Sequence, residues 1–392
     1  MPLERCSETT CFGCAACAAG CPVQAIRMVP REGGFLYPEI DADRCVHCGR
    51  CDAVCPIGKS DTLVRKPQRT LAVWSKTSVR SDSTSGGAFT ELATSVLNRG
   101  GAVCGAALFL SEYKVRHVCA ETEADLAPLR KSKYVQSETL YALRKALTIL
   151  KQKRPVLFVG TPCQVAGYRL LTQRFGDIAL SCDLVCGSVP APGVFEKYLK
   201  ELEAKAHAKV VEYDFRDKSA GWNFPRAHIT YASGKQTKTP IRCDVHYAAF
   251  AHKLGCRATC ATCPFARQER TGDFTIADCW RVASYNGSFD DNHGTSLLLV
   301  QSKAGEALLD DVQQQNTARL LPYDLSHATK CNIPLHRTFP ESSHRTDFLK
   351  RIDTGEAPTD VIKSFLGTHW QLKPTLIFWI KRLGWFYFRK HQ

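Results

Sequence analysis

The apolar and polar positions along the middle of the chain alternate between the periods of strands and helices. Short apolar runs predict strands at residues 71–74, 102–110, 115–121, 155–159, 178–185 and 297–301. The run at 155–159 is continuous, as expected for a strand buried on both faces. Apolar residues recur at helical spacing at residues 88–99, 138–151, 164–175, 193–207 and 303–312. Strands that alternate with helices in this way predict a doubly wound α/β core.

Residues 210–240 interrupt this alternation. A predicted strand at 210–215 is followed by segments 227–231 and 235–240, which flank Ser233-Gly234 and indicate a hairpin. We expect an antiparallel insert that covers a site on the α/β core. Residues 57–70 are polar, charged and proline-containing without a period, and they predict a linker to the amino-terminal segment.

The amino-terminal segment repeats one cysteine motif. Four cysteines at fixed spacing end in proline, and the motif returns 34 residues later: Cys11, Cys14, Cys17, Cys21 and then Cys45, Cys48, Cys51, Cys55. Three thiolates at steps of three can surround one face of a cubic cluster, while the fourth, held aside by the proline, reaches the other cluster. The predicted ligand sets of two 4Fe-4S clusters are Cys11, Cys14, Cys17 with Cys55, and Cys45, Cys48, Cys51 with Cys21.

Zinc knuckles or a disulfide framework are the alternatives, but zinc has no use for a crossed fourth ligand. Residues 1–60 resemble a bacterial-type two-cluster ferredoxin domain, and this resemblance implies one-electron transfer. Gly13, Gly20 and Gly49 leave space for backbone to approach inorganic sulfur, where amides tune the potential. Cys6 lies outside the repeat and receives no role.

The composition is that of an ordinary globular protein apart from its cysteines. Of the 392 residues, 44% are hydrophobic and 23% charged, which allows a large core in two or three units. Twenty cysteines are too many for a cytosolic protein without a metal role. Because no signal sequence precedes Cys11, we expect a reducing cytoplasm rather than secretion and disulfide pairing.

The formal charge of +14 falls when clusters are counted. A 4Fe-4S core with four thiolates carries about −2, so three clusters would leave about +8. Six lysines and arginines, and no acid, follow Asp360. Since no nucleic-acid-binding motif is present, we expect no nucleic-acid partner.

Two turns at strand ends are candidate ligand sites. Ser85-Gly86-Gly87 opens the helix at 88–99, where free amides can meet an anion such as phosphate, although a simple helix cap explains the same residues. Gly160-Thr161-Pro162-Cys163 follows the strand at 155–159, at the position where open α/β sheets bind ligands. Lys133 lies between predicted elements, either solvated or free to meet a cofactor.

Cysteines farther along the chain indicate a third metal site. Cys256, Cys260 and Cys263 lie within eight residues of one another, and Cys163 and Cys186 stand at the ends of predicted strands. A lone Cys-x2-Cys could hold zinc or nothing, but these five cysteines together favour a metal centre.

Five motifs in order, GTPCQ, CDLVCG, FRDKSAGW, RATCATC and GDFTIADCW, resemble the coenzyme F(420) hydrogenase/dehydrogenase beta-subunit family over residues 1 to about 330. The resemblance implies a ferredoxin-like α+β domain followed by a mixed α/β domain that holds FAD and a further 4Fe-4S cluster. The implied third-cluster ligands are Cys163, Cys186, Cys260 and Cys263, with Cys182 and Cys256 in reserve. The implied FAD-binding residues are Ser85, Gly86, Gly87, Lys133, Tyr134, Gln136, Gly160 and Thr161.

Residues 277–281 depart from the family pattern. Relatives usually carry Gly-Asp-Phe-Trp-Gly where this chain has Ala277-Asp278-Cys279-Trp280-Arg281, and Gly187-Ser188 replaces a common His-Gly pair. We expect these changes on the substrate side of the flavin, where they bear on the use of a deazaflavin more than on cofactor binding.

Four parts are therefore expected: a ferredoxin domain at 1–60, two parts of a flavin-binding domain at 71–153 and 154–330, and a helical, basic and aromatic tail at 331–392. Segment 374–390 is aromatic and basic, contains no acid, and is too short to span a bilayer. A helix at a membrane interface and a helix docked on the core or on a partner both fit it.

Together these expectations describe an iron–sulfur flavoprotein oxidoreductase. Single electrons would pass through the ferredoxin domain and a hydride through FAD. The partners would be a ferredoxin or another redox subunit and a small-molecule hydride donor or acceptor. A non-catalytic electron-relay subunit is the alternative, and a zinc-bearing scaffold is the third interpretation.

Overall fold

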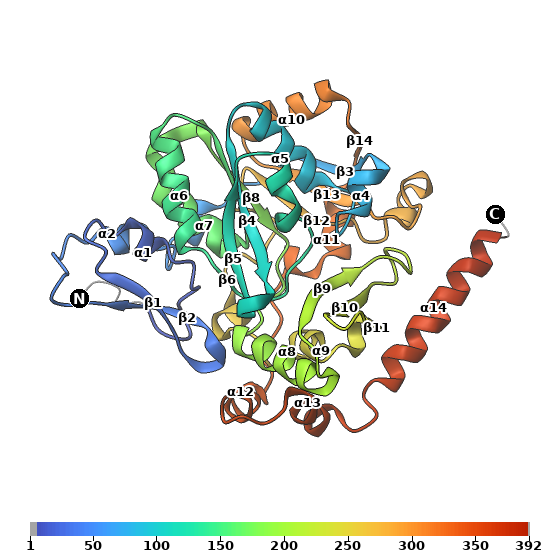
Figure 1. Ribbon diagram of the computed structural model, residues 1–392. Helices are drawn as coiled ribbons and strands as arrows, with labels where there is room; N and C mark the ends of the chain where they lie inside the picture. Colours follow the sequence, from blue (N-terminus) through green and yellow to red (C-terminus); the bar gives the residue numbers. More distant parts are fainter. Residues whose placement is uncertain (1–5, 391–392) are drawn as a thin grey trace.

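A nine-stranded mixed sheet forms the centre of the molecule (Figure 1). The computed structural model describes residues 6–390, with side chains described as far as Leu383. In spatial order the strands are β14 (Ala318–Pro322), β3 (Arg69–Ser75), β13 (Ser296–Val300), β12 (Phe274–Asp278), β8 (Ala179–Leu184), β7 (Val156–Gly160), β4 (Ala102–Phe109), β5 (Lys114–Ala120) and β6 (Ser137–Glu138). Strands β12, β8, β7 and β4 run parallel, so their carboxyl ends share one edge of the sheet.

Helices cover both faces of this sheet, as the doubly wound prediction requires. Helices α5 (Ala88–Asn98) and α10 (Lys303–Gln315) pack on one face through apolar residues that include Leu92 and Leu308. Helices α6 (Leu140–Lys151) and α7 (Pro162–Thr172) pack on the other through residues that include Leu143 and Tyr168. Strand β7 is buried along its whole length, which confirms the interpretation of the continuous run at 155–159.

Several boundaries differ from the prediction. The predicted helix at 138–151 begins at Leu140, because Ser137 and Glu138 pair with β5 as strand β6. Strands β12 and β14 were not predicted. The segment 57–70 is not a plain linker, since it contains helix α3 (Ser60–Leu63) and the first residues of β3.

The amino-terminal unit is a small α+β module on the side of the sheet. It contains α1 (Ala16–Gly20), the antiparallel pair β1 (Ile26–Pro30) and β2 (Leu36–Ile40), and α2 (Arg50–Ala53). Helix α1 packs against α6 and α7, and the Thr139 hydroxyl donates to the Cys14 carbonyl at 2.8 Å. The module therefore has a fixed place on the core (Figure 1).

The predicted antiparallel insert is a second sheet of three strands. These are β9 (Val210–Asp217), β10 (Arg226–Tyr231) and β11 (Gln236–Pro240), and β10 pairs with both neighbours. Helices α8 (Pro192–Ala206) and α9 (Val245–Ala251) accompany it.

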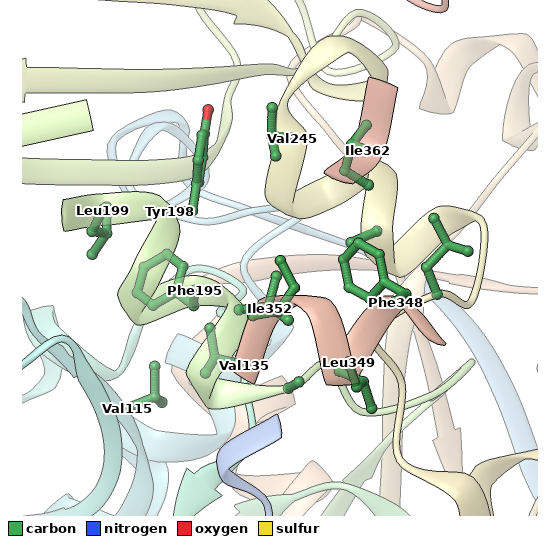
Figure 2. Packing of buried hydrophobic residues seen from close by; sticks show 14 of the residues in the cluster. Val115, Val135, Phe195, Tyr198, Leu199, Val245, Phe348, Leu349, Ile352 and Ile362 are labelled. Carbon is green, nitrogen blue, oxygen red and sulfur yellow. The ribbon is translucent and has the colours of Figure 1, made fainter. Parts of the chain in front are cut away.

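The first half of the expected tail belongs to this layer. Helices α12 (Arg345–Asp353) and α13 (Pro358–Leu366) bury their apolar faces in the same cluster as α8. Figure 2 shows Ile352 of α12 next to Phe195 of α8, with Phe348 of α12 on the other side of Ile352.

Two shorter helices lie elsewhere in the chain: α4 (Thr77–Ser81) and α11 (Leu325–Cys331).

Cys104 on β4 and Cys119 on β5 lie directly opposite each other on neighbouring antiparallel strands, and a disulfide joins them. This differs from the expectation of a chain without disulfide pairing. The two cysteines are 15 residues apart, and only the antiparallel register of β4 and β5 brings them together.

The last helix, α14 (Leu372–Lys390), extends away from the body (Figure 1). Its first turns are attached to the 3-10 helix Ile241–Cys243, where Gln371 Nε2 donates to the Cys243 carbonyl at 2.7 Å. Phe378 packs edge-on against Phe224, with ring centroids 6.0 Å apart. Within residues 6–390, no helix is long and apolar enough to cross a membrane.

Candidate redox sites

Two hollows in the amino-terminal module are lined by the predicted crossed sets of cysteines. We call the first the proximal hollow; its cysteines are Cys11, Cys14, Cys17, Cys55 and also Cys6. We call the second the distal hollow; its cysteines are Cys21, Cys45, Cys48 and Cys51. The fourth cysteine of each motif thus lines the hollow of the other motif. Cys48 is exposed, so the distal hollow lies at the surface.

Cys6 is the residue that the sequence motif missed in the proximal hollow. Its thiol hydrogen-bonds to Cys11, and this bond is the main cause that lowers the pKa of Cys11 to about 6. Burial raises the pKa values of Cys14 and Cys17 in the same hollow. A 4Fe-4S cluster binds cysteines as thiolates, so a cluster bound in this hollow would displace the protons of these buried thiols.

A third hollow, the core hollow, lies at the carboxyl edge of the parallel strands. Its cysteines are Cys163, Cys186, Cys260 and Cys263, the four that the resemblance implied. Burial raises the pKa of Cys163 to about 11 and that of Cys186 to about 12. The residues therefore fit a buried centre that takes four thiolates.

Local sequence explains why Cys163 points into this hollow. The sequence placed Cys163 in the turn before the helix, but helix α7 begins at Pro162, so Cys163 lies in its first turn. Thr161 caps the helix, and its amide donates to Gln164 Oε1 at 3.0 Å in a capping box. Gly160 leaves the space that the Gln164 side chain occupies.

A buried ion pair fixes the chain around the core hollow. Arg270 Nη2 lies 2.8 Å from Asp183 Oδ1, and both side chains are buried. The Asp183 carboxylate also accepts from the amides of Thr271 and Gly272, while Arg270 donates to the Leu184 carbonyl. The pair thus joins the end of β8, just before Cys186, to the loop that follows Cys263.

The other cysteines lie outside the three hollows. Cys182 is buried in the sheet, and the Cys256 sulfur lies 3.2 Å from Ser188 Oγ; neither reserve ligand lines the core hollow. Within residues 6–390, no group of His, Cys, Asp and Glu side chains is placed to hold a single metal ion.

The proximal and core hollows share a wall. Phe12 lines both of them, and its ring lies 5.6 Å from that of Phe265, between centroids. Arg257 lines the core hollow and hydrogen-bonds to the Cys11 carbonyl at 2.8 Å. The amino-terminal module therefore supplies part of the surface around the third site.

The predicted flavin residues lie along the same edge of the sheet, but several have structural partners. Gly86 packs so closely on Val73 and Ser296 that no side chain would fit, and Gly87 has φ of 91°. Ser85 Oγ donates to the Thr295 carbonyl at 2.6 Å. The Ser-Gly-Gly turn is thus explained by close packing of β3 and β13, whether or not it also meets a phosphate.

The loop at 131–136 faces this turn. The Ser132 amide donates to Thr84 Oγ1 at 2.8 Å, which joins two of the segments predicted to surround FAD. Lys133 Nζ donates to the carbonyls of Pro128 and Arg130, and burial lowers the pKa of Lys133 to about 7. Gln136 instead turns toward the amino-terminal module, where its Oε1 accepts from the Leu36 amide.

Four buried nitrogen atoms around this loop have no hydrogen-bond partner among the described residues. They are Arg130 Nε, Arg216 Nη2, His117 Nδ1 and His246 Nδ1. His246 contacts the loop through the Tyr134 carbonyl, 2.6 Å from its Nε2. Buried polar nitrogens rarely lack partners in native proteins. The two arginine nitrogens can donate, whereas each histidine Nδ1 is an acceptor because its ring donates from Nε2 to a backbone carbonyl. The four atoms therefore fit a ligand that offers both acceptors and donors, such as a flavin nucleotide.

Asp278 contacts two residues at the side of the sheet edge that lies nearest the three-stranded insert. It pairs with the buried Arg216 and accepts from Trp222 Nε1 at 2.9 Å. Trp222 stacks on Trp280 with ring centroids 5.0 Å apart. The motifs FRDKSAGW and GDFTIADCW, 56 positions apart at Trp222 and Asp278, therefore form one cluster.

The residues that depart from the family pattern do not all face the same side of the sheet edge. Cys279 is buried in an apolar cluster that also contains Ala277 and Tyr323. The expectation that the changes lie on the substrate side of the flavin stays a prediction, but the side chains of Ala277 and Cys279 face the interior. Arg281 has a positive φ of 60° and is exposed at the start of a short 3-10 helix.

The fold and the three hollows define the class: an iron–sulfur oxidoreductase-like subunit built from a ferredoxin module and a mixed α/β core. Two family models, coenzyme F(420) hydrogenase/dehydrogenase beta subunit amino terminus and carboxyl terminus, match residues 70–144 and 153–325. A 4Fe-4S dicluster domain matches residues 10–59. The chain belongs to the coenzyme F(420) hydrogenase/dehydrogenase beta-subunit family.

Individual proteins resemble this chain to different extents. A subunit of the F(420)H(2) dehydrogenase of Methanosarcina mazei is 24% identical over 257 residues, which is 62% of this chain and 71% of that protein. A subunit of the ion-translocating oxidoreductase complex of Methanosarcina acetivorans is 45% identical over 49 residues, 12% of this chain and 17% of that protein. A chain of the F(420)-reducing NiFe hydrogenase complex from Methanosarcina barkeri has a TM-score of 0.46 at 13% identity, over 75% of this chain and 95% of that one.

Proposed function

We propose that this chain is an iron–sulfur flavoprotein oxidoreductase with three 4Fe-4S clusters and FAD. The observation that carries the proposal is the row of cysteine sites. The distal hollow lies at the surface, and the proximal and core hollows share Phe12 as a wall. The core hollow in turn lies at the edge of the sheet where the residues predicted to bind FAD gather. Electrons from a redox partner would follow this row inward.

The clusters would supply one-electron transfer, and FAD would connect that to hydride transfer. The residues of the chain position these groups and exclude water. Eight cysteines of the module would hold the first two clusters, and Cys163, Cys186, Cys260 and Cys263 the third. Lys133 and the unpartnered Arg130 and Arg216 nitrogens supply positive charge and donors for the flavin nucleotide.

The small-molecule substrate would meet the flavin beside the cluster of Arg216, Asp278 and Trp280. Arg216 Cζ lies 5.3 Å from the centroid of the Trp280 ring, and Arg216 Nη2 has no partner among the described residues, so a free donor lies beside an aromatic ring. A planar hydride carrier with acceptor oxygens would suit this place, and we expect a reduced deazaflavin or a nicotinamide to serve.

Anaerobic purification followed by iron, sulfide and flavin analysis tests the proposal. We expect about twelve iron atoms and one FAD per chain. Reduced ferredoxin and a hydride donor should each reduce the flavin. Replacing Cys11 and Cys45 by Ser should abolish only the reduction by ferredoxin, while Cys331→Ser, outside the hollows, should leave both intact.

The alternative is a relay subunit whose substrate site belongs to a partner chain. A similar protein of Methanosarcina mazei is named as a subunit of a dehydrogenase, which favours redox partner subunits. Fully loaded protein that contains clusters but no flavin would replace the oxidoreductase proposal by this one.

We also propose a peripheral membrane contact through α14. Five apolar side chains form a stripe along the described part of the helix: Leu372, Leu376, Trp379, Ile380 and Leu383. Each is 48% to 67% exposed, whereas Thr375 and Phe378 attach the opposite side to the body. The expected aromatic residues beyond Leu383 lie outside the described side chains.

The charges around this stripe favour anionic lipid over another apolar surface. Lys373, Lys381 and Arg382 lie beside it, and the chain contains no acid after Asp360. An amphipathic helix with cations binds at the headgroup level, where apolar burial and attraction to anionic lipid add together. A helix docked on a partner protein is the competing interpretation.

A further inference from the structure

Arg257 is a buried cation between two of the cysteine hollows. Its side chain is almost wholly inaccessible, with 2% of the residue exposed. It lines the core hollow together with Cys163 and Cys260. Its Nε donates to the Cys11 carbonyl at 2.8 Å, and Nη2 donates to the Leu36 carbonyl at 3.1 Å. One guanidinium therefore touches both the core and the amino-terminal module.

The other buried arginines each have a carboxylate partner. The pairs are Arg80 with Asp291, Arg216 with Asp278, Arg270 with Asp183 and Arg345 with Glu32. Arg257 has no carboxylate partner among residues 6–390; its neighbours there include the rings of Tyr37 and Phe35, 4.1 and 5.5 Å from Cζ to the centroids, and the Cys11 side chain. Its Nη1 also lacks a hydrogen-bond partner there.

An unpaired charge in the interior is costly, and proteins normally compensate it with a counter-ion. The cysteines of the two hollows are the groups that can supply it. A 4Fe-4S core with four thiolates carries about −2. Gly13 lines the proximal hollow, and because it has no side chain, its backbone can lie directly against Nη1 of Arg257.

We propose that Arg257 is the shared counter-charge of the proximal and core clusters, and that it sets both of their reduction potentials. The inference rests on the proposed presence of these clusters. Reduction adds an electron to an already anionic group, so a nearby cation stabilises the reduced state more than the oxidised one. Arg257 thus keeps both potentials higher than the clusters alone would have. It is a positioning and tuning residue, not a catalytic one.

The test is a potentiometric titration of anaerobic protein followed by electron paramagnetic resonance, which reports each cluster without turnover. In Arg257→Met, the potentials of the proximal and core clusters should fall, while that of the distal cluster stays. We expect the reduced-to-oxidised ratio at fixed ambient potential to drop on the order of tenfold, about 59 mV for one electron. Arg257→Lys should show a smaller fall because it keeps the charge.

Arg144→Met is the matched control. Arg144 also joins the core to the module, since its Nη2 donates to the Ala18 carbonyl at 3.4 Å, but it lines none of the three hollows. Its replacement should leave all three potentials unchanged. An equal shift in Arg144→Met and Arg257→Met would mean that loosened docking, not charge, causes the effect, and would overturn the inference.

Iron loading of the Arg257 variants is a second measurement. If Arg257→Met loads less iron, Arg257→Lys should restore loading, and failure to restore it would contradict the role of charge. Wild-type protein without the core cluster would refute the proposed function itself. Wild-type protein with all three clusters, and unchanged potentials in a fully loaded Arg257→Met, would refute only the role of Arg257.

Discussion

The Leu36 amide of the ferredoxin module donates to Gln136 Oε1 of the sheet-edge loop at 3.0 Å. This bond connects the module directly to the loop that we expect at the flavin, because Gln136 is only three positions after Lys133. The resemblance placed Gln136 among FAD-binding residues, and the structure gives it a second task at the junction. Docking of the module and order in the loop should therefore depend on each other.

Gln136→Met tests this junction. The substitution removes the acceptor for a partly buried amide, which costs about 1 to 3 kcal/mol of local stability when the donor stays unpaired. We expect faster hydrogen exchange at Leu36 and in the module, with iron content unchanged. Gln152→Met, at the exposed end of α6, is the control. If hydrogen exchange is unchanged in Gln136→Met but flavin is lost, Gln136 binds the cofactor and does not stabilise the junction.

The ligand set of the third cluster is tested by paired substitutions. Cys260→Ser with Cys263→Ser should remove about four of about twelve iron atoms, because each cubic cluster holds four. The two ferredoxin signals in electron paramagnetic resonance should remain. Cys256→Ser is the matched control, since Cys256 is buried nearby but does not line the core hollow. Iron loss in the control would show that the ligand set is wrong.

Lys133 predicts a pH dependence of flavin binding. Burial lowers the pKa of Lys133 to about 7, although Asp214 opposes this shift, so at pH 8 most of the free protein has a neutral amine. A bound pyrophosphate raises the pKa again, and binding at pH 8 must therefore take up a proton. Calorimetry in two buffers of different ionisation enthalpy measures this uptake.

At pH 6 the amine is already protonated, and the uptake should disappear. Lys133→Met should bind FAD tenfold to a hundredfold more weakly, the result of losing a charge-assisted bond of about 1.5 to 3 kcal/mol. Lys133→Arg keeps the cation and should take up no proton at pH 8 through this position. Lys218 is a second candidate proton acceptor near the Ser85 turn, because burial lowers its pKa to about 8. If proton uptake remains in Lys133→Arg, its loss in Lys218→Arg would show that Lys218 takes up that proton.

The tail helix predicts binding to anionic vesicles. At low salt the protein should float with vesicles that contain anionic lipid and leave them as salt rises, because surface charges are screened over about 8 Å near physiological ionic strength. Lys381→Gln with Arg382→Gln should weaken binding roughly thirtyfold at about 1 kcal/mol per cation. Lys350→Gln with Lys363→Gln, on α12 and α13, is the matched control.

Ile380→Glu should abolish flotation, since it places a charge in the apolar stripe. Flotation that survives removal of residues 372–392 would contradict the membrane proposal. Self-association that depends on the stripe, without vesicle binding, would instead indicate that a second copy of the chain covers it.

Sequence predicted the parts of the molecule that local spacing determines. The crossed cysteine sets follow from two motifs and a proline at the end of each, and β7 follows from an uninterrupted apolar run. The four cysteines of the core hollow come from three separate segments, so spacing alone yielded only a group of candidates. The family resemblance was needed to select four of these five candidates and to leave Cys256 out.

Other features depend on contacts that no local pattern encodes. The Cys104–Cys119 pair depends on the register of two strands, and the Asp183–Arg270 pair joins residues 87 positions apart. Gly86 was interpreted as a place for phosphate, whereas close packing of strands already requires a glycine there. Cys6 stood outside the motif because its position in the proximal hollow depends on how the chain folds back before Cys11.

Phe12 belongs to the ferredoxin module but also lines the core hollow, so the module cannot be exchanged without changing that hollow. A ferredoxin unit taken from another protein would bring its own cysteines, but it would complete the third site only with an aromatic side chain at this position and a backbone that reaches Arg257. The boundary near residue 60 divides the sequence, yet the surface around the third site crosses that boundary. Exchange of either half alone would therefore alter the lining of the third site.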